Sequence, residues 1–165
     1  ERVAECAEAV RVMNSRLSNE GTHLRDFTMA ELLACRQHMS DIVYRRAHHV
    51  ISEDVRTRAA CDAMRSGDAT ILGRLMTDSD HSLKDDYEVT CPELDAMTDA
   101  ARSLPGCYGA RMTGAGFGGC TIHLVADDAL VDFQANLMDE YLRRTGIKGE
   151  IIVSVPAQGA GPVQL

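Results

Sequence analysis

The chain has 165 residues, of which 45% are hydrophobic and 25% are charged, and its formal net charge at pH 7 is −8. This length predicts one domain, and this hydrophobic content excludes a disordered chain. The negative charge argues against binding to nucleic acid or to an anionic membrane surface, because both need a cationic face, and no apolar run reaches the length of a membrane span.

The spacing of the cysteines indicates their redox state, and the first residue bears on whether the sequence is part of a longer protein. No two cysteines form a C-x-x-C pair, and most lie among apolar neighbours (Cys6, Cys35, Cys61, Cys91, Cys107 and Cys120). This pattern predicts reduced thiols and a cytoplasmic location. The chain starts with Glu1 inside a helical pattern, so we expect it to be a piece of a longer protein.

Helical periodicity dominates the first hundred residues. The apolar spacing predicts a helix over 2–13, with Val3, Ala7, Val10 and Met13 on its buried face. Thr28 and Glu31 have the spacing of a capping box at the start of a second helix.

Two further helices follow on either side of a glycine. The first covers about 41–65, ends at Gly67, and turns five positions inward (Val43, Ala47, Val50 or Ile51, Val55 and Ala59). The second begins at Asp68 and runs to about Leu83. A third helix is predicted to begin with a capping box of Thr90 and Glu93, and to end at Pro105-Gly106.

The hydrophobic period then changes to that of strands. We expect strands at 107–112, 120–126 and 150–155, and a helix at about 128–144 that is capped by Asp127 or Asp128 and stopped by Gly146. A run of helices followed by this order predicts an α+β fold, with helices packed on one face of a small, mostly antiparallel sheet.

The connection between the first two strands is dense in glycine. The stretch from Gly114 to Gly119 (GAGFGG) matches G-x-G-x-x-G, but a strand follows where a dinucleotide-binding loop would open a helix. The lysine of a P-loop is absent, and so are the H-R-D and D-F-G motifs of protein kinases. Two interpretations stay open: a nest of backbone N–H groups that binds an anion, or a tight connection that packs against a neighbouring backbone.

The amino-acid sequence of this loop resembles a conserved motif of a known family. The stretch from Gly109 to Thr121 (GARMTGAGFGGCT) is similar to the third conserved motif of the GHMP small-molecule kinases. Several stretches resemble the galactokinase branch of that family: Arg111-Met112, Phe117, the segments 45–50 and 82–95, Lys148, and the tail 156–161.

The resemblance implies a function, and it implies which half of the complete protein carries the catalytic residues. It implies a GHMP kinase C-terminal domain of ferredoxin-like type over residues 1–165, and ATP-dependent phosphorylation of galactose at its 1-hydroxyl. It also implies that an N-terminal half, not found in this sequence, carries the ATP phosphate loop, the Mg²⁺ ligands and the catalytic residues, and makes the contacts to galactose and ATP. We therefore expect this chain alone to be inactive, to bind no cofactor, and to self-associate through an apolar face.

The resemblance also implies that the glycine loop lies close to the transferred phosphate. The loop residues concerned are Thr113, Gly114, Ala115, Gly116, Gly118 and Gly119. Ala115 stands where many relatives have glycine, so we expect an ordinary backbone angle there. For the Thr113 hydroxyl we favour a structural hydrogen bond over one to phosphate. Tyr87 and Asp86 are candidates to line the cleft.

Other polar clusters have ordinary interpretations. Asp85, Asp86 and Glu88 suggest a solvated loop more than a metal site, and the histidines show no ligand spacing. Arg45 and Arg46 are interpreted as part of an exposed, charge-laced helix face.

Three alternative functions remain open. One is another GHMP kinase, acting on N-acetylgalactosamine or mevalonate, and another is a galactose sensor without catalysis on the same fold. The last is a free-standing module that binds a small molecule.

Overall fold

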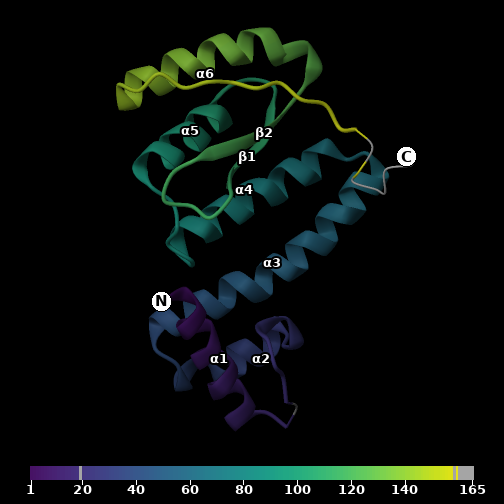
Figure 1. Ribbon diagram of the computed structural model, residues 1–165. Helices are drawn as coiled ribbons and strands as arrows, with labels where there is room; N and C mark the ends of the chain where they lie inside the picture. The colour runs from purple at the N-terminus through teal and green to yellow at the C-terminus, as the bar shows by residue number, and fades with distance from the viewer. Residues whose placement is uncertain (19, 158, 160–165) are drawn as a thin grey trace, which may run out of the picture.

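The computed structural model describes residues 1–18, 20–157 and 159. Within this part the chain forms six α-helices and one β-hairpin (Figure 1). In chain order these are α1 (Arg2–Arg16), α2 (Met29–Cys35), α3 (Asp41–Ser66), α4 (Ala69–Asp85), α5 (Pro92–Ser103), β1 (Cys107–Thr113), β2 (Cys120–Val125) and α6 (Leu130–Thr145). None of the described helices has the length and apolar character needed to cross a membrane.

The first three helices enclose one hydrophobic core. Its fully buried members come from α1, α2, α3 and the loop between the first two helices (Ala9, Met13, Leu24, Phe27, Leu32, Cys35, Ala47 and Ile51). The predicted capping box is confirmed, since Thr28 Oγ1 accepts from the Glu31 amide and the Glu31 carboxylate accepts from the Thr28 amide. The predicted face of α1 is wrong at Val3, which is 83% exposed, and at Ala7, which is also exposed. Both α2 and α3 lie against α1, on the side that carries Ala9 and Met13.

Helix α3 extends from this core to the rest of the molecule (Figure 1). It ends where predicted, at Gly67, which takes the left-handed conformation with φ of 69°, and Asp68 caps α4 by accepting from the Ile71 amide. Ala47 and Ile51 are buried as expected, but Val55 is 56% exposed. Beyond the N-terminal core α3 packs mainly against α4, which covers only one side of it.

The second core lies between the hairpin and the last two helices. Strands β1 and β2 pair antiparallel, from Cys107 with Val125 to Thr113 with Cys120, with a bulge near Cys107 and Gly109. Small and large apolar residues from α5, β1 and α6 form this core (Ala100, Ala101, Ala110, Phe133 and Leu137). The α+β prediction is confirmed.

The outer edge of β1 is closed by α4. Gly73 of α4 and Gly109 of β1 cross so closely that a Cβ on Gly73 would lie 2.2 Å from the Tyr108 carbonyl oxygen. Further along, the Met112 amide donates to the buried Asp80 carboxylate at 2.8 Å, and Arg102 donates to the Ala110 carbonyl. Side chains thus satisfy backbone groups that a third strand would otherwise pair with, which fixes β1 firmly in place.

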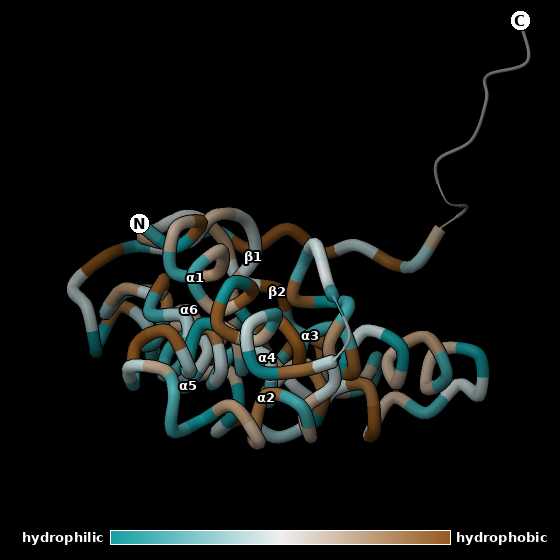
Figure 2. Tube along the Cα trace, turned by 90° about the horizontal axis from the view of Figure 1, so that it is seen from below, coloured by the Kyte–Doolittle hydropathy of each residue, from teal (hydrophilic) through white to brown (hydrophobic). Residues whose placement is uncertain are grey.

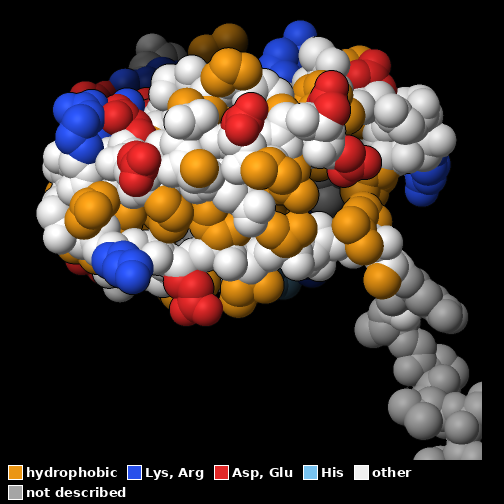
Figure 3. Space-filling view, turned by 90° about the horizontal axis from the view of Figure 1, so that it is seen from above, with side chains coloured by type: hydrophobic (Ala, Val, Ile, Leu, Met, Phe, Trp, Pro, Cys, Tyr) orange, Lys and Arg blue, Asp and Glu red, His pale blue; other side chains and the backbone are white. Residues whose placement is uncertain are grey.

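The predicted strand at 150–155 is wrong, because this segment is not a strand in the structure. Its sequence has the β-branched residues of a strand, but a strand also needs a partner, and the only pairing among the described residues is β1 with β2. Ile151 packs on the second core, whereas Ile152 and Val155 are 85% and 73% exposed. In Figure 2 much of this stretch has the brown colour of hydrophobic residues, and Figure 3 shows apolar side chains gathered between charged ones over the α6 side. The tail residues 158 and 160–161 of the resemblance lie outside the described part.

Two predicted caps are also wrong. Cys91 precedes α5 in place of Thr90, with Pro92 at the first helical position and no side-chain cap. Asp127 and Asp128 form a short 3₁₀ turn before α6 and do not cap it, whereas the predicted stop at Gly146 is confirmed by its φ of 71°.

Candidate functional site

The glycine loop joins β1 to β2 at one end of the hairpin. Its four glycines all have positive φ: 87° at Gly114, 84° at Gly116, 136° at Gly118 and 107° at Gly119. Ala115 is not among the residues with positive φ, as predicted. The loop needs glycine because side chains are strained at these angles.

Most backbone N–H groups of this loop have no partner. Within the described residues, the loop amides between the two strands make one hydrogen bond, from Phe117 to the Val89 carbonyl at 2.7 Å. A Cβ on Gly114, Gly118 or Gly119 would meet nothing within 4 Å. The open side of the loop therefore presents unpaired N–H donors, as an anion-binding nest does.

The other side of the loop packs closely on the turn that follows α4. A Cβ on Gly116 would lie 2.1 Å from the Val89 carbonyl oxygen, so glycine is needed there for space as well as for its angle. The close packing that the sequence left open is thus found on one side of the loop, whereas anion binding on the open side stays a prediction.

Phe117 is the least expected residue of the loop. Its φ is 60° although it has a side chain, and the ring is 70% exposed. The hydrogen bond to Val89 holds the amide in this conformation, because the surrounding contacts must offset the cost of a left-handed angle. The neighbouring Thr113 is exposed, and the structural hydrogen bond that we favoured for its hydroxyl is not found among the described residues.

The candidate cleft residues Asp86 and Tyr87 lie in the turn that follows α4, and the side chains of both contact other residues of the chain. The Asp86 carboxylate accepts from the Ser82 hydroxyl and contacts His48 Nδ1, each at 2.9 Å. The Tyr87 ring stacks on His49 with 4.4 Å between centroids. Both residues belong to the turn whose Val89 contacts the glycine loop, but their own side chains hold that turn together.

Two histidines near the site are neutral. Burial lowers the pKa of His49 to about 4, and burial together with the positive charge of Arg102 lowers the pKa of His123 to about 4. His49 contacts the Ser82 hydroxyl, and His123 contacts the Thr121 hydroxyl. Neither side chain is free to act as a base on a substrate in this arrangement.

The interpretation of Arg46 as exposed is wrong. Its side chain is 2% exposed and bonds Glu5, the Asp86 carbonyl and Glu88, whereas the neighbouring Arg45 bonds Glu88 from the outer side. These partners are about 40 residues away in sequence, so the local charge pattern of the helix could not reveal them. The resemblance of segment 45–50 to galactokinases was the one signal in the sequence that pointed to this arginine.

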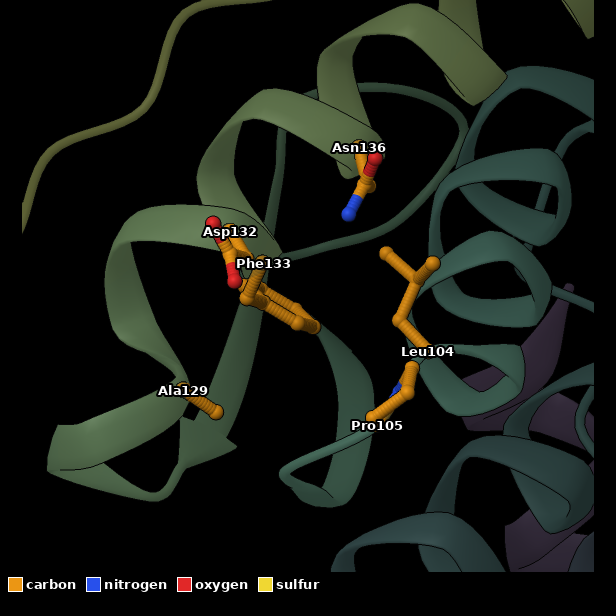
Figure 4. A pocket seen from close by; sticks show the side chains of 6 residues that line it. All are labelled: Leu104, Pro105, Ala129, Asp132, Phe133 and Asn136. Carbon is orange, nitrogen blue, oxygen red and sulfur yellow. The ribbon is translucent and has the colours of Figure 1, made fainter.

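Two hollows in the described surface are small, and no residue of the glycine loop lines either of them. One of about 180 Å³ lies between the end of α5 and α6; Leu104 and Phe133 point into it, with Asp132 and Asn136 nearby (Figure 4). A second, of about 150 Å³, lies between α3 and α4 with Arg56 and Arg111 at its wall. Both are below the ~300 Å³ at which pockets for small ligands begin.

Comparison with known proteins decides between the families that such a loop allows. The family model of the GHMP kinase C-terminal domain (GHMP kinases C terminal) matches residues 60–143, just over half of the chain. The chain belongs to the GHMP kinase family. This domain of the family includes the α4 crossing, the hairpin and the whole glycine loop.

Several relatives of this GHMP kinase domain are named galactokinase. A galactokinase of Bos taurus is 45% identical over 140 residues, which are 85% of this chain and 34% of that protein. A galactokinase of Chloroflexus aurantiacus is 41% identical over 163 residues, 99% of this chain and 42% of that protein. The crystal structure of Lactococcus lactis galactokinase complexed with galactose superposes with a TM-score of 0.83 and 39% identity, over 89% of this chain and 38% of that one. The chain thus spans about two fifths of the length of these relatives.

Proposed function

We propose that this chain is the C-terminal domain of a galactokinase, and that the complete enzyme transfers the γ-phosphoryl group of ATP to the 1-hydroxyl of galactose. The bond from the γ-phosphorus to the oxygen that bridges it to ADP breaks, and a bond to the galactose oxygen forms. The hydroxyl proton passes to a base in the N-terminal half. The names of the relatives support this proposal, and one of them holds galactose.

One observation about this chain carries the proposal: the hairpin presents backbone N–H donors that have no partner among the described residues. Phosphoryl transfer depends on positioning and on stabilising charge on the transferred oxygens. Donors fixed before the reaction stabilise such charge without having to reorganise. The closed edge of β1 supplies the fixed support.

The proposal leaves Mg²⁺, the catalytic base and most sugar contacts to the N-terminal half. Bound Mg²⁺ would neutralise charge on the ATP phosphates. The described residues contain no group of three or more His, Cys, Asp or Glu side chains that could hold a metal ion, so we assign Mg²⁺ to no residue of this chain. We also propose a cytoplasmic location, which the six free cysteines favour.

The test uses the full-length protein and two matched substitutions. Gly114 and Gly67 both have left-handed φ and open space around the missing Cβ, and only Gly114 lies in the glycine loop. Changing either to Ala costs about 1–2 kcal/mol of backbone free energy. We expect Gly114→Ala to lower kcat at least tenfold in an assay of galactose 1-phosphate formation, and Gly67→Ala to leave kcat within twofold.

The same assay separates the alternatives. Equal kcat values for the two variants would contradict a role of the glycine loop in the reaction. A panel of galactose, N-acetylgalactosamine and mevalonate identifies the acceptor, and galactose binding without ADP release would identify a sensor.

A further inference from the structure

The turn that follows α4 has an unusual set of hydrogen bonds. Each of its five successive carbonyl groups, from residue 85 to residue 89, accepts a hydrogen bond from a distant part of the chain. The donors are Arg45 to Asp85 O at 2.6 Å, Arg46 to Asp86 O at 2.5 Å, Arg2 to Tyr87 O at 2.6 Å and to Glu88 O at 3.0 Å, and the Phe117 amide to Val89 O at 2.7 Å. Cations suit this place because the carbonyls at a helix C-terminus carry partial negative charge.

The three arginines, Arg2, Arg45 and Arg46, form what we call the arginine clamp. Its central member is Arg46, whose buried guanidinium also bonds the carboxylates of Glu5 and Glu88. The fork of a guanidinium can satisfy two carboxylates and a carbonyl together, which an ammonium group on a lysine stem cannot do in the same geometry.

The clamp holds a strained turn. Glu88 has φ of 53°, and its carboxylate accepts hydrogen bonds from Arg46 and Arg45, which lower its pKa to about 2. A left-handed angle at a residue with a side chain persists only where its surroundings fix it. The next residue, Val89, is thereby held with its carbonyl directed at the glycine loop.

That carbonyl is the one hydrogen-bond acceptor that the described residues give to the loop amides, and it also lies where a side chain on Gly116 would be. The chain of contacts therefore runs from a buried arginine on α3, through a fixed turn, to the amide of Phe117. We infer that Arg46, with Arg45 and Arg2, is a positioning residue that sets the place of the glycine loop through the Val89 carbonyl. Its effect on the reaction rests on the proposed function.

The test follows the Phe117 amide directly in the full-length protein. This chain contributes three phenylalanines, so among its residues ¹⁵N-phenylalanine labelling gives one probe in the loop and two elsewhere: Phe27, bonded to Leu24 O in the N-terminal core, and Phe133 in α6. The variants are Arg46→Lys, which keeps the charge, and Arg45→Met, at a partly exposed position. The control is Arg58→Lys, since Arg58 lies on the same helix, is 77% exposed and, within the described part of the chain, forms an ion pair with Asp54 alone.

We expect hydrogen exchange at Phe117 to become at least tenfold faster in Arg46→Lys and severalfold faster in Arg45→Met, with Phe27 and Phe133 changed by less than twofold. We also expect kcat to fall about tenfold in Arg46→Lys, with KM for galactose within twofold of the unchanged protein. Arg58→Lys should change neither.

Unchanged exchange at Phe117 in both clamp variants, or an equal increase at all three phenylalanines, would overturn the inference. Faster exchange at Phe117 with unchanged kcat would support the inferred link and would instead count against the proposed function of the loop.

Discussion

At the scale of single residues, burial lowers the pKa of two histidines strongly. His49 lies between Tyr87, which stacks on it, and the Ser82 hydroxyl, and His123 lies edge-on to Phe133. Both have a pKa of about 4, well below the ordinary 6.5. Each is thus neutral when folded and takes up a proton more readily when unfolded.

This difference predicts acid sensitivity between pH 6.5 and pH 4. In that window the unfolded chain binds more protons than the folded one, so stability falls as the pH falls. From pH 7 to pH 5 we expect the free energy of unfolding to drop by about 2 kcal/mol for each of the two histidines. Urea unfolding at both values checks this, with His123→Leu expected to lose about half of the drop; an unaltered drop would show that His123 does not contribute.

At the scale of elements, the contact of α4 with β1 decides the placement of the hairpin. Gly73 and Gly109 allow the two backbones to touch, and Asp80 then reaches the Met112 amide. Helix ends such as Gly67 and the Thr28 box could be predicted from sequence because their causes lie within a few residues. The Gly73 crossing could not, since its partner is a strand 35 positions later in the sequence.

The crossing gives a prediction about stability. Gly73→Ala places a Cβ 2.2 Å from the Tyr108 carbonyl oxygen, which forces α4 away from β1. Overpacking of this kind costs about 3 kcal/mol or more, against about 1–2 kcal/mol for Gly67→Ala, where there is open space. Chemical denaturation of the two variants compares the costs directly, and similar losses would mean that the two backbones separate easily.

At the scale of the whole molecule, the segment after α6 is the main place where the sequence misled. Its β-branched residues predict a strand, yet a strand depends on a neighbour that may belong to any part of a protein, and pattern alone cannot supply one. For the candidate site the same limit applies: the glycine motif could be recognised, whereas Arg46 and Val89 depend on contacts across some 40 and 28 residues of sequence.

The exposed segment predicts how the isolated chain behaves. Ile152, Val153 and Val155 present apolar side chains to water, and such surfaces favour association. We expect residues 1–165 alone to form dimers or larger species as concentration rises in sedimentation velocity, and Ile152→Thr with Val155→Thr to shift the chain toward monomer. A monomer at every concentration would contradict this.

Because one side of β1 is closed, the sheet can be extended on its other side alone. With Asp80 and Arg102 occupying the backbone groups on that side, the hairpin can gain a further strand only alongside β2, whose Ile122 is 53% exposed. Any part of a complete enzyme that extends this sheet must therefore approach from the side opposite α4.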